Sequence, residues 1–294
     1  MKLRIAAARH LVGEPHDFAA FAGGIEAEVS VATEAGAQVV VLPEYLALEA
    51  AAMLPAATRG DFARSLAALQ VHHADYLALA SGLARRHGIY LVAGTFLLDV
   101  GGRYRNRAWL AGPDGATAWQ DKLVLTGFER ASGIIEPGDQ LKVFDTAFGR
   151  LAIQVCYDIE FPLHARNQVE AGARLVLVPS CTDTEAGATR VRVGCQARAL
   201  ENQVHVACAV TAGEAHWSPA LDVNTGDAAI CTPIDAGFPA DGIAARAGAG
   251  QTWAIADIDL DAMDALRREG QVANADDWKR QLRQSMARAR VEKV

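Results

Sequence analysis

The chain has 294 residues, of which 51% are hydrophobic and 21% are charged, and its formal net charge is −7. This composition is typical of a globular protein that is long enough to bury a large core, and it excludes a disordered chain. The acidic balance argues against a nucleic-acid-binding surface, which needs a basic stripe. The five cysteines are widely spaced and form no Cys-x-x-Cys pair, a pattern that predicts no zinc ribbon and suits a reducing compartment.

The N-terminal residues, Met-Lys-Leu-Arg-Ile, lead directly into a predicted strand and do not resemble a signal peptide. No apolar run in the sequence is long enough to cross a membrane. We therefore expect a cytoplasmic protein whose partners include neither membrane nor nucleic acid.

Predicted strands and helices alternate through the first half of the chain. A helix is expected over 17–35, and a long Ala- and Leu-rich helix over 61–87. The segment 123–133 has no periodic pattern, and we expect an irregular loop there. The predicted strands of this half are 3–8, 38–42, 90–98, 104–111 and 117–120.

The second half continues the same alternation and then changes character. Its Gly-, Pro- and Ala-rich segment 233–250 is typical of a loop, and the polar segments 261–268 and 276–290 are expected to be helices. The last of these is too charged for a core, so it should pack on a surface or on a partner subunit. The other predicted elements are strands 141–145, 151–155, 205–210, 228–232 and 252–257, a further strand within 172–180, and helices 162–171 and 190–202.

One sequence pattern occurs twice. Residues 36–44 and 172–180 each contain a glycine that ends a helix, a fully apolar strand, and a proline that ends the strand. Apolar strands of this kind lie in the middle of a sheet that is covered on both faces. The repeat indicates two similarly built halves whose sheets stack on each other.

A strand, a cysteine and then a turn into a helix follow one another over residues 149–162. The apolar run ends at Cys156, and Pro162 suits the first turn of a helix because its missing N–H has no partner there. This is the geometry of a nucleophile elbow, and a helix N-terminus beside a thiol should lower its pKa. A buried structural cysteine is the alternative, since free cysteine is among the most buried residue types.

Two further polar residues also follow predicted strands. Glu44 comes directly after the strand 38–42, and Lys122 follows the strand 117–120. Taken singly, each would be interpreted as a surface charge. Functional sites of α/β proteins collect at the carboxyl ends of strands, so Glu44 and Lys122 are candidates to meet Cys156.

Together these segments resemble the nitrilase, or carbon–nitrogen hydrolase, superfamily. Leu-Pro-Glu44, Asp-Lys122-Leu and Val-Cys156-Tyr-Asp come in the family order of Glu, Lys and Cys. The resemblance covers nearly the whole chain, and the combination of motifs is highly specific. Further matches are Tyr104-x-Asn106, Glu129, Phe161-Pro162, the strand that ends in Pro179-Ser180, and Arg198-Ala199-x-Glu201-Asn202.

The resemblance implies a four-layer α-β-β-α sandwich with two stacked mixed sheets, and subunits that pair at least as a homodimer. We assign residues 1–270 to this domain and 271–294 to a C-terminal helical tail. The resemblance further implies a cysteine nucleophile that works without metal or organic cofactor. The segments 181–184 and 197–203 look like the branch often fused to an acetyltransferase domain, and we expect no room for such a domain within these 294 residues.

The implied chemistry assigns a role to each residue. Cys156 would attack the carbonyl carbon, Glu44 would carry the proton, and Lys122 with the backbone N–H of Tyr157 would face the oxyanion. Glu129 would position Lys122 or the substrate, although a plain salt bridge is an equal alternative. Candidates for contact with the substrate are Asp183, Glu160 and Arg130. Asp183, Glu185 and Arg190 could line the substrate mouth, although ordinary loop charges are the better interpretation of these three.

We therefore expect hydrolysis of a small linear carboxamide or carbamoyl compound through a cysteine thioester. Nitrile hydrolysis and acyl transfer could use the same three residues. A catalytically silent scaffold protein is the alternative from another class.

Overall fold

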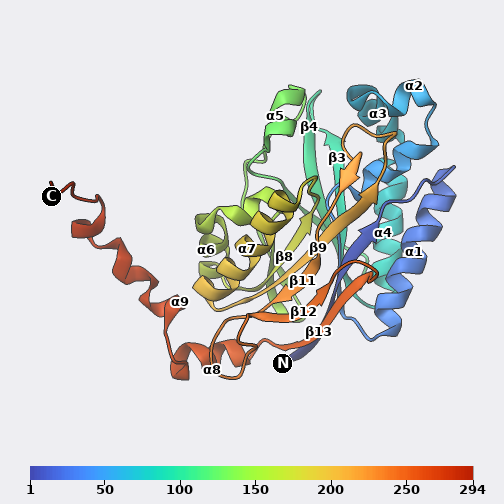
Figure 1. Ribbon diagram of the computed structural model, residues 1–294. Coiled ribbons are helices and arrows are strands. Elements are labelled where there is room, and N and C mark those ends of the chain that lie inside the picture. The colour runs from blue at the N-terminus through green and yellow to red at the C-terminus, as the bar shows by residue number, and fades with distance from the viewer. Residues whose placement is uncertain (294) are drawn as a thin grey trace.

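The computed structural model describes residues 1–293 and contains two β-sheets stacked between two layers of helices (Figure 1). The four-layer α-β-β-α sandwich expected from the sequence is therefore confirmed. The strands of the first sheet, in spatial order, are β5 (Thr117–Asp121), β4 (Tyr104–Ala111), β3 (Tyr90–Asp99), β2 (Val39–Leu42), β1 (Lys2–Leu11) and β13 (Trp253–Asp259). Those of the second are β6 (Val143–Thr146), β7 (Gly149–Ile153), β8 (Ala173–Ser180), β9 (His205–Glu214), β11 (Ala228–Cys231) and β12 (Ile243–Ala247), with β10 (Val223–Asn224) beside β9.

The two sheets are continuous through the end of β1. Arg9–Leu11 pair in parallel with Val210–Ala212 of β9, while the earlier part of β1 pairs with β2 and β13. The repeated segments become β2 and β8, and each lies between two parallel neighbours in its own sheet. Their equivalent positions explain why both sequences are uninterrupted apolar runs.

The helical layers cover the outer faces of the sheets. Figure 1 shows α1 and α4 on one side of the sandwich and α6 and α7 on the other. The helices and 3₁₀ turns of the body are α1 (Phe18–Glu34), η1 (Leu46–Met53), α2 (Ala56–Arg59), α3 (Phe62–Leu69), η2 (Gln70–His72), α4 (His73–His87), α5 (Gly127–Ser132), η3 (Cys156–Glu160), α6 (Pro162–Glu170), α7 (Glu185–Asn202) and α8 (Ala262–Glu269).

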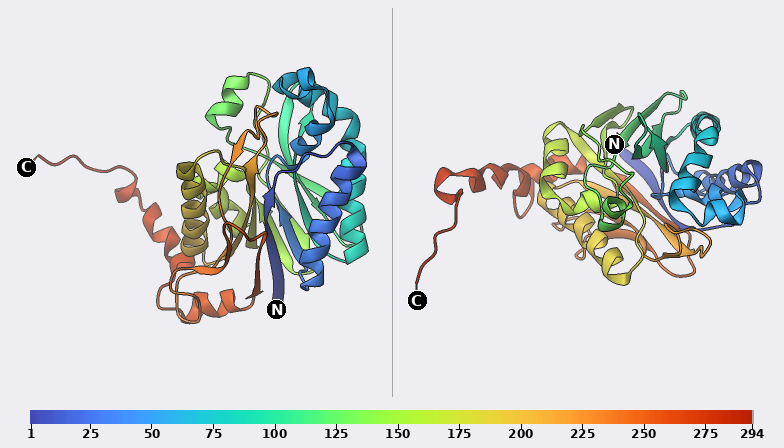
Figure 2. Two further views of the ribbon diagram at one scale, coloured as in Figure 1. Left: turned by 45° about the vertical axis from the view of Figure 1, so that its right-hand side comes forward. Right: turned by 90° about the horizontal axis from the view of Figure 1, so that it is seen from above.

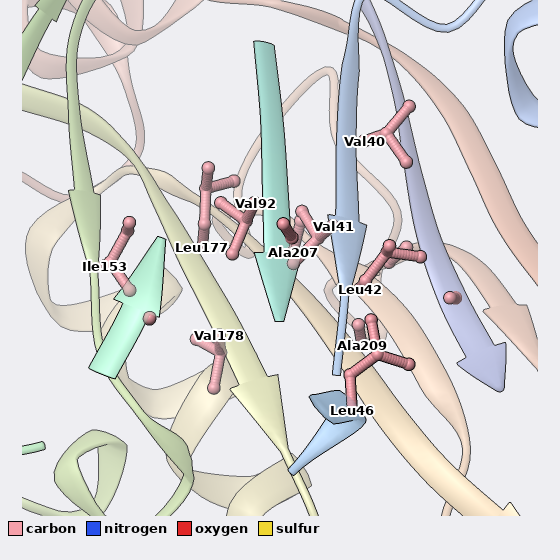
Figure 3. Packing of buried hydrophobic residues seen from close by; sticks show 14 of the residues in the cluster. Val40, Val41, Leu42, Leu46, Val92, Ile153, Leu177, Val178, Ala207 and Ala209 are labelled. Carbon is pink, nitrogen blue, oxygen red and sulfur yellow. The ribbon is translucent and has the colours of Figure 1, made fainter. Parts of the chain in front are cut away.

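The core lies between the two sheets. Figure 3 shows Val41 and Val92 of the first sheet gathered with Leu177 and Ala207 of the second. All four side chains are fully buried. Because both inner faces are aliphatic and close-packed, the strand ends that carry the polar residues are held on a rigid support.

Three expectations for the body are wrong in part. The expected helix 61–87 breaks at η2, where the Gln70 side chain donates to the carbonyls of Leu66 and Leu97. The expected loop 123–133 contains α5, whose first turn is closed by Thr126 and Glu129. The expected loop 233–250 contains β12, which pairs with β11.

The C-terminal segment also differs from the expected helix 276–290. It forms only α9 (Asn274–Asp277), η4 (Trp278–Leu282) and η5 (Gln284–Met286), and it extends away from the sandwich (Figures 1 and 2). Its contact with the body includes Trp278, whose ring lies 4.9 Å from the guanidinium carbon of Arg166. Short isolated helices are marginal in water, and these turns have little packing to support them. None of the helices described over residues 1–293 has the length and apolarity that a membrane span requires.

Candidate active site

Three strand ends bring Glu44, Lys122 and Cys156 to one cavity of about 270 Å³. Glu44 follows β2 and Lys122 follows β5, and Cys156 lies three residues beyond the end of β7. Residues that are far apart in the sequence therefore share a single hollow at one edge of the sandwich, where the resemblance places them.

Sharp backbone turns present two of these residues. Cys156 has φ 48° and Tyr45, which follows Glu44, has φ 61°. Both values lie in the left-handed region, which is unfavourable for residues other than glycine. The strand before Cys156 ends at Ile153, two residues earlier than expected, and the chain turns into η3 before α6 begins. Local strain of this kind persists where the surrounding structure holds it, as at functional sites.

Lys122 lies between two buried carboxylates. Its Nζ is 2.8 Å from Glu44 Oε1 and 2.9 Å from Glu129 Oε2. The Asn106 amide donates to both carboxylates, at 2.8 Å to Glu44 and 3.0 Å to Glu129. All four side chains are buried. This network fixes the ammonium group because every charged partner is itself hydrogen-bonded.

Glu129 is held by its own helix and by the turn after β2. One carboxylate oxygen accepts the N–H of Thr126 at 2.8 Å, which forms the capping box of α5. The other oxygen accepts the Tyr45 hydroxyl at 2.9 Å. With all these partners, Glu129 acts as a fixed negative group behind Lys122.

The Cys156 thiol and Glu44 share a neighbouring segment. The thiol is 3.4 Å from the carbonyl oxygen of Cys181, and the Ser180 hydroxyl is 3.3 Å from the sulfur. The N–H of Cys181 donates to Glu44 Oε2 at 3.0 Å. The end of β8 therefore orients both the sulfur and the carboxylate oxygen that is not bound to Lys122.

The environment raises the pKa of the Cys156 thiol well above its ordinary value. Burial is the main cause and the nearby Glu44 carboxylate adds to it, while Lys122 acts in the opposite direction. The lowered thiol pKa expected from the sequence is therefore wrong. A thiolate here would be a third negative charge beside one buried cation, so the neutral thiol is the resting form.

Burial and charge also set the pKa values of the other three groups. Burial, with Glu129 nearby, raises the pKa of Glu44 despite the opposing effect of Lys122. Burial alone would lower the pKa of Lys122, but Glu44 and Glu129 outweigh it and the pKa is raised well above its ordinary value. Burial opposes ionisation of Glu129, yet Lys122 and the hydrogen bonds to it hold its pKa below the ordinary value.

The expected backbone donor lies at the start of η3. Asp158 donates its N–H to the carbonyl of Val155, so the N–H of Tyr157 precedes the first hydrogen bond of this turn. The first N–H groups of a helical turn have no partner within it. The Asp158 carboxylate accepts the N–H groups of Leu123 and Val124, which ties the segment after Lys122 to this turn.

The structure separates the three candidates for substrate contact. Glu160 and Asp183 both line the cavity. Arg130 is exposed and is not among the lining residues, and its guanidinium instead donates to the carbonyl of Leu125. As the fourth residue of α5, Arg130 is directed away from the buried face that carries Glu129.

Several residues of the site have no signal in the sequence that singles them out. Tyr45 follows Glu44 directly, and its contact with Glu129 depends on the left-handed turn. Asp222 and Asn224 line the cavity from the segment around β10. Asn106 belongs to the quoted Tyr-x-Asn segment and binds Glu44 and Glu129, but neither Asn106 nor Tyr104 lines the cavity.

Comparison with known proteins decides the family. The sequence profile of the carbon-nitrogen hydrolase family matches residues 4–268 of this chain. The chain belongs to the carbon-nitrogen hydrolase family. Its resemblance to the nitrilase superfamily is thereby confirmed over nearly the whole sequence.

Similar proteins include a bacterial and a vertebrate protein. The probable hydrolase YhcX of Bacillus subtilis is 32% identical over 283 residues, which are 95% of this chain and 54% of that protein. This chain thus spans about half the length of that relative. Omega-amidase NIT2-B of Xenopus laevis is 28% identical over 251 residues, which are 82% of this chain and 83% of that protein.

Two solved structures, one of a nitrilase-superfamily member and one of an amidase, have the same fold. Nit3 of Saccharomyces cerevisiae superposes with a TM-score of 0.73 at 23% identity, covering 91% of this chain and 93% of that chain. An amidase from Nesterenkonia sp. AN1 superposes with a TM-score of 0.66 at 26% identity, covering 91% of this chain and 97% of that chain. In that structure acrylamide has undergone Michael addition at the active-site cysteine.

Proposed function

We propose that this carbon-nitrogen hydrolase cleaves small linear carboxamides or carbamoyl compounds through a thioester on Cys156. The observation that carries the proposal is the convergence of Glu44, Lys122 and Cys156 in one cavity. Support comes from the relatives named omega-amidase and amidase, and from the modified cysteine of the Nesterenkonia enzyme.

Proton transfer and attack occur together in the first step. The Cys156 sulfur bonds to the amide carbon while its proton passes to Glu44, since a free thiolate is unfavourable in this pocket. The carbonyl oxygen gains negative charge and faces the Lys122 ammonium and the Tyr157 N–H. One such donor contributes about 2.7–4 kcal/mol to lowering the barrier.

The second half of the reaction returns the proton and frees the acid. The carbon–nitrogen bond breaks as Glu44 gives its proton to the departing nitrogen, which leaves a thioester. Glu44 then takes a proton from water as the water oxygen attacks the thioester carbon. The carbon–sulfur bond breaks and the sulfur recovers that proton. A carboxyl group with a raised pKa suits this two-way role.

Lys122 and Glu129 keep fixed charges through the cycle. The pKa of Lys122 is raised, so it stays an ammonium and stabilises the oxyanion without giving up a proton. Glu129 is a second carboxylate partner of Lys122 beside Glu44, and it carries no proton itself. The cavity thus contains one group that moves protons and one that supplies constant positive charge.

A panel of short amides and the matching nitriles, assayed for ammonia release, tests the proposal. We expect wild-type protein to release ammonia from amides, Cys156→Ala and Glu44→Gln to release none, and mass spectrometry of acid-quenched wild type to detect an acyl adduct on Cys156. Added hydroxylamine should divert part of the product if the thioester accepts amines. Amide hydrolysis would be contradicted if folded wild-type protein released ammonia from the nitriles alone. It would also be contradicted if folded wild-type protein released no ammonia at all, and that result would favour a silent scaffold.

A further inference from the structure

The mouth of the active-site cavity is acidic. Glu160, Asp183 and Asp222 line it, and Arg190 is the cationic side chain among them. Deeper in the cavity the opposite charges of Glu44 and Lys122 balance each other. The lining residues of the mouth therefore carry an excess of two negative charges.

The arginine at the mouth is already engaged. Arg190 Nε lies 3.4 Å from Glu160 Oε1, so these two side chains neutralise each other. Within residues 1–293, no ion pair involves Asp183 or Asp222. Asp222 receives a hydrogen bond from the N–H of Val223, and both aspartates are exposed at the entrance. Two carboxylates thus face the substrate path without a cation.

The other walls of the mouth suit a cation better than an anion. Phe128 and Tyr157 contribute aromatic side chains, and Val191, Pro219 and Ala220 contribute apolar surface. The faces of aromatic rings attract cations. A substrate carboxylate here would meet negative charge and apolar surface, and the positive charge of Arg190 is already offset by Glu160.

We infer that the substrate is a linear amide or carbamoyl compound whose far end carries a positive charge, such as a primary ammonium, received by Asp183 and Asp222. This inference rests on the proposed function, because the amide is placed at Cys156. The acidic mouth concentrates cationic substrates by electrostatic attraction and repels dicarboxylic monoamides.

Three amides of matched length separate the effect of the charge at the far end of the substrate from the effect of its length. We would measure kcat/KM for 5-aminopentanamide, hexanamide and adipamate, which end in an ammonium, a methyl and a carboxylate group. The expected order is ammonium first and carboxylate last, with about tenfold between the ammonium and methyl compounds at low salt. High salt should shrink this ratio because the mouth is open to solvent.

Substitutions locate the effect. The double variant Asp183→Asn with Asp222→Asn should bring the ammonium-to-methyl ratio of kcat/KM close to one. The control is Glu34→Gln with Asp75→Asn, which removes the same charge from helices α1 and α4. It should keep the wild-type ratio. An equal fall of the ratio in both double variants would mean that net charge alone sets the preference, which contradicts the inference. A ratio that is unchanged in the Asp183→Asn, Asp222→Asn variant would also overturn it.

The two proposals fail in different ways. Hydrolysis of hexanamide or adipamate in preference to 5-aminopentanamide would overturn the inference and leave amide hydrolysis standing. If folded wild type hydrolyses none of the three, amide hydrolysis fails. Calorimetric binding of the same compounds to Cys156→Ala then decides the charge preference, since tighter binding of the ammonium compound supports it and equal or weaker binding contradicts it.

Discussion

Glu129 makes as many polar contacts as any side chain of the site, although it is placed behind Lys122. Its carboxylate accepts hydrogen bonds from Thr126, Asn106 and Tyr45 as well as the ion pair with Lys122. Glu44 binds the same ammonium, so removal of Glu129 would leave one carboxylate to neutralise the cation and also to carry the proton. In the proposed mechanism, Glu129 would free Glu44 for proton transfer by sharing the charge of Lys122.

The variant Glu129→Gln tests this role. Its amide can keep part of the hydrogen-bond network but has no charge, so Lys122 should draw Glu44 into a tighter pair and lower its pKa. We expect kcat to fall by about 10²–10³, as large as the loss of one oxyanion donor, because the position of Lys122 and the basicity of Glu44 both change. Steady-state ammonia release would measure it. Circular dichroism would show whether the fold is retained, and a folded variant with wild-type kcat would contradict the role.

The pKa directions of Cys156 and Glu44 predict two pH profiles. The Cys156 thiol has a raised pKa, so its alkylation by iodoacetamide should keep accelerating as the pH rises past about 9. The kcat/KM profile should lose activity on the acidic side with an apparent pKa above 4.5, because Glu44 must be ionised to accept the proton. Mass spectrometry of the alkylated peptide gives the first profile. An alkylation rate that reaches its plateau near neutral pH would contradict the conclusion that the resting thiol is protonated.

At the scale of elements, η3 couples the cysteine turn to the segment after Lys122. The Asp158 carboxylate accepts the N–H of Leu123 at 3.1 Å, of Val124 at 2.8 Å and of Val155 at 3.3 Å. These donors belong to two strand ends of different sheets. The carboxylate therefore ties the backbone before Cys156 to the backbone after Lys122.

Asp158→Asn should loosen this link. The asparagine amide offers one acceptor oxygen where the carboxylate has two, so at least one buried N–H loses its partner. We expect the free energy of unfolding to fall by about 1–3 kcal/mol, the cost of an unsatisfied buried group. Urea unfolding measures it, with the exposed Asp139→Asn as a control. A loss of kcat without loss of stability would point instead to direct contact with the substrate.

A second coupling joins β1, α1 and η1 through a buried histidine. His10 Nδ1 is 2.7 Å from Glu28 Oε2, and Nε2 is 2.6 Å from Glu49 Oε2. Burial alone would lower the pKa of His10, but the two carboxylates outweigh it and raise the pKa from 6.5 to about 10. Both ring nitrogens donate when the ring is charged, so the imidazolium form fits this site.

This cluster predicts a fall in stability at alkaline pH. The unfolded chain releases the His10 proton near pH 6.5 and the folded chain near pH 10, so its stabilisation is complete below pH 6.5 and lost as the pH rises to about 10. We expect a loss of a few kcal/mol over this window, measured by urea unfolding at several pH values. The double variant His10→Gln with Glu49→Gln should flatten the profile, and an equally steep profile in it would assign the dependence elsewhere.

The sequence predicts most elements whose pattern is local. The apolar strand 38–42 and the glycine that precedes it suffice to place Glu44 at a sheet edge. The break at Gln70 has no glycine or proline to reveal it, because it depends on a bond to the carbonyl of Leu97 in another element. The helix α5 is only six residues long, although its Thr-x-x-Glu capping pair is visible in the sequence.

Within the site, residue identity was more predictable than protonation. Motif order alone indicated Glu44, Lys122 and Cys156, whereas the raised thiol pKa depends on how completely the surroundings exclude water. The partner of Tyr45 and the cavity-lining position of Asp222 follow from turns and loop paths that no sequence period encodes. Such contacts can be identified only in the folded structure, because they join segments that share no sequence pattern.

For the whole molecule, the C-terminal segment is the part with the least support from the rest of the chain. Trp278 packs on Arg166, and beyond it Leu282, Met286 and Val291 are 70%, 59% and 95% exposed. Exposed apolar side chains in an extended segment are typical of a surface that another subunit covers. We therefore predict that residues 279–294 contribute to subunit pairing and little to the stability of the sandwich.

Deletion of residues 279–294 separates these two contributions. We expect the truncated chain to melt within about 2 °C of the full chain, because no core residue of the sandwich is removed. Light scattering after size exclusion should give a dimer mass for the full chain and a concentration-dependent shift toward monomer for the truncated one, as the apolar contacts between subunits are lost. The variant Trp278→Ala, which keeps the distal residues, serves as the control for the contact with Arg166. A truncated chain that remains fully dimeric would place the subunit interface on the sandwich itself, and a large drop in melting temperature would mean that the segment packs on its own chain.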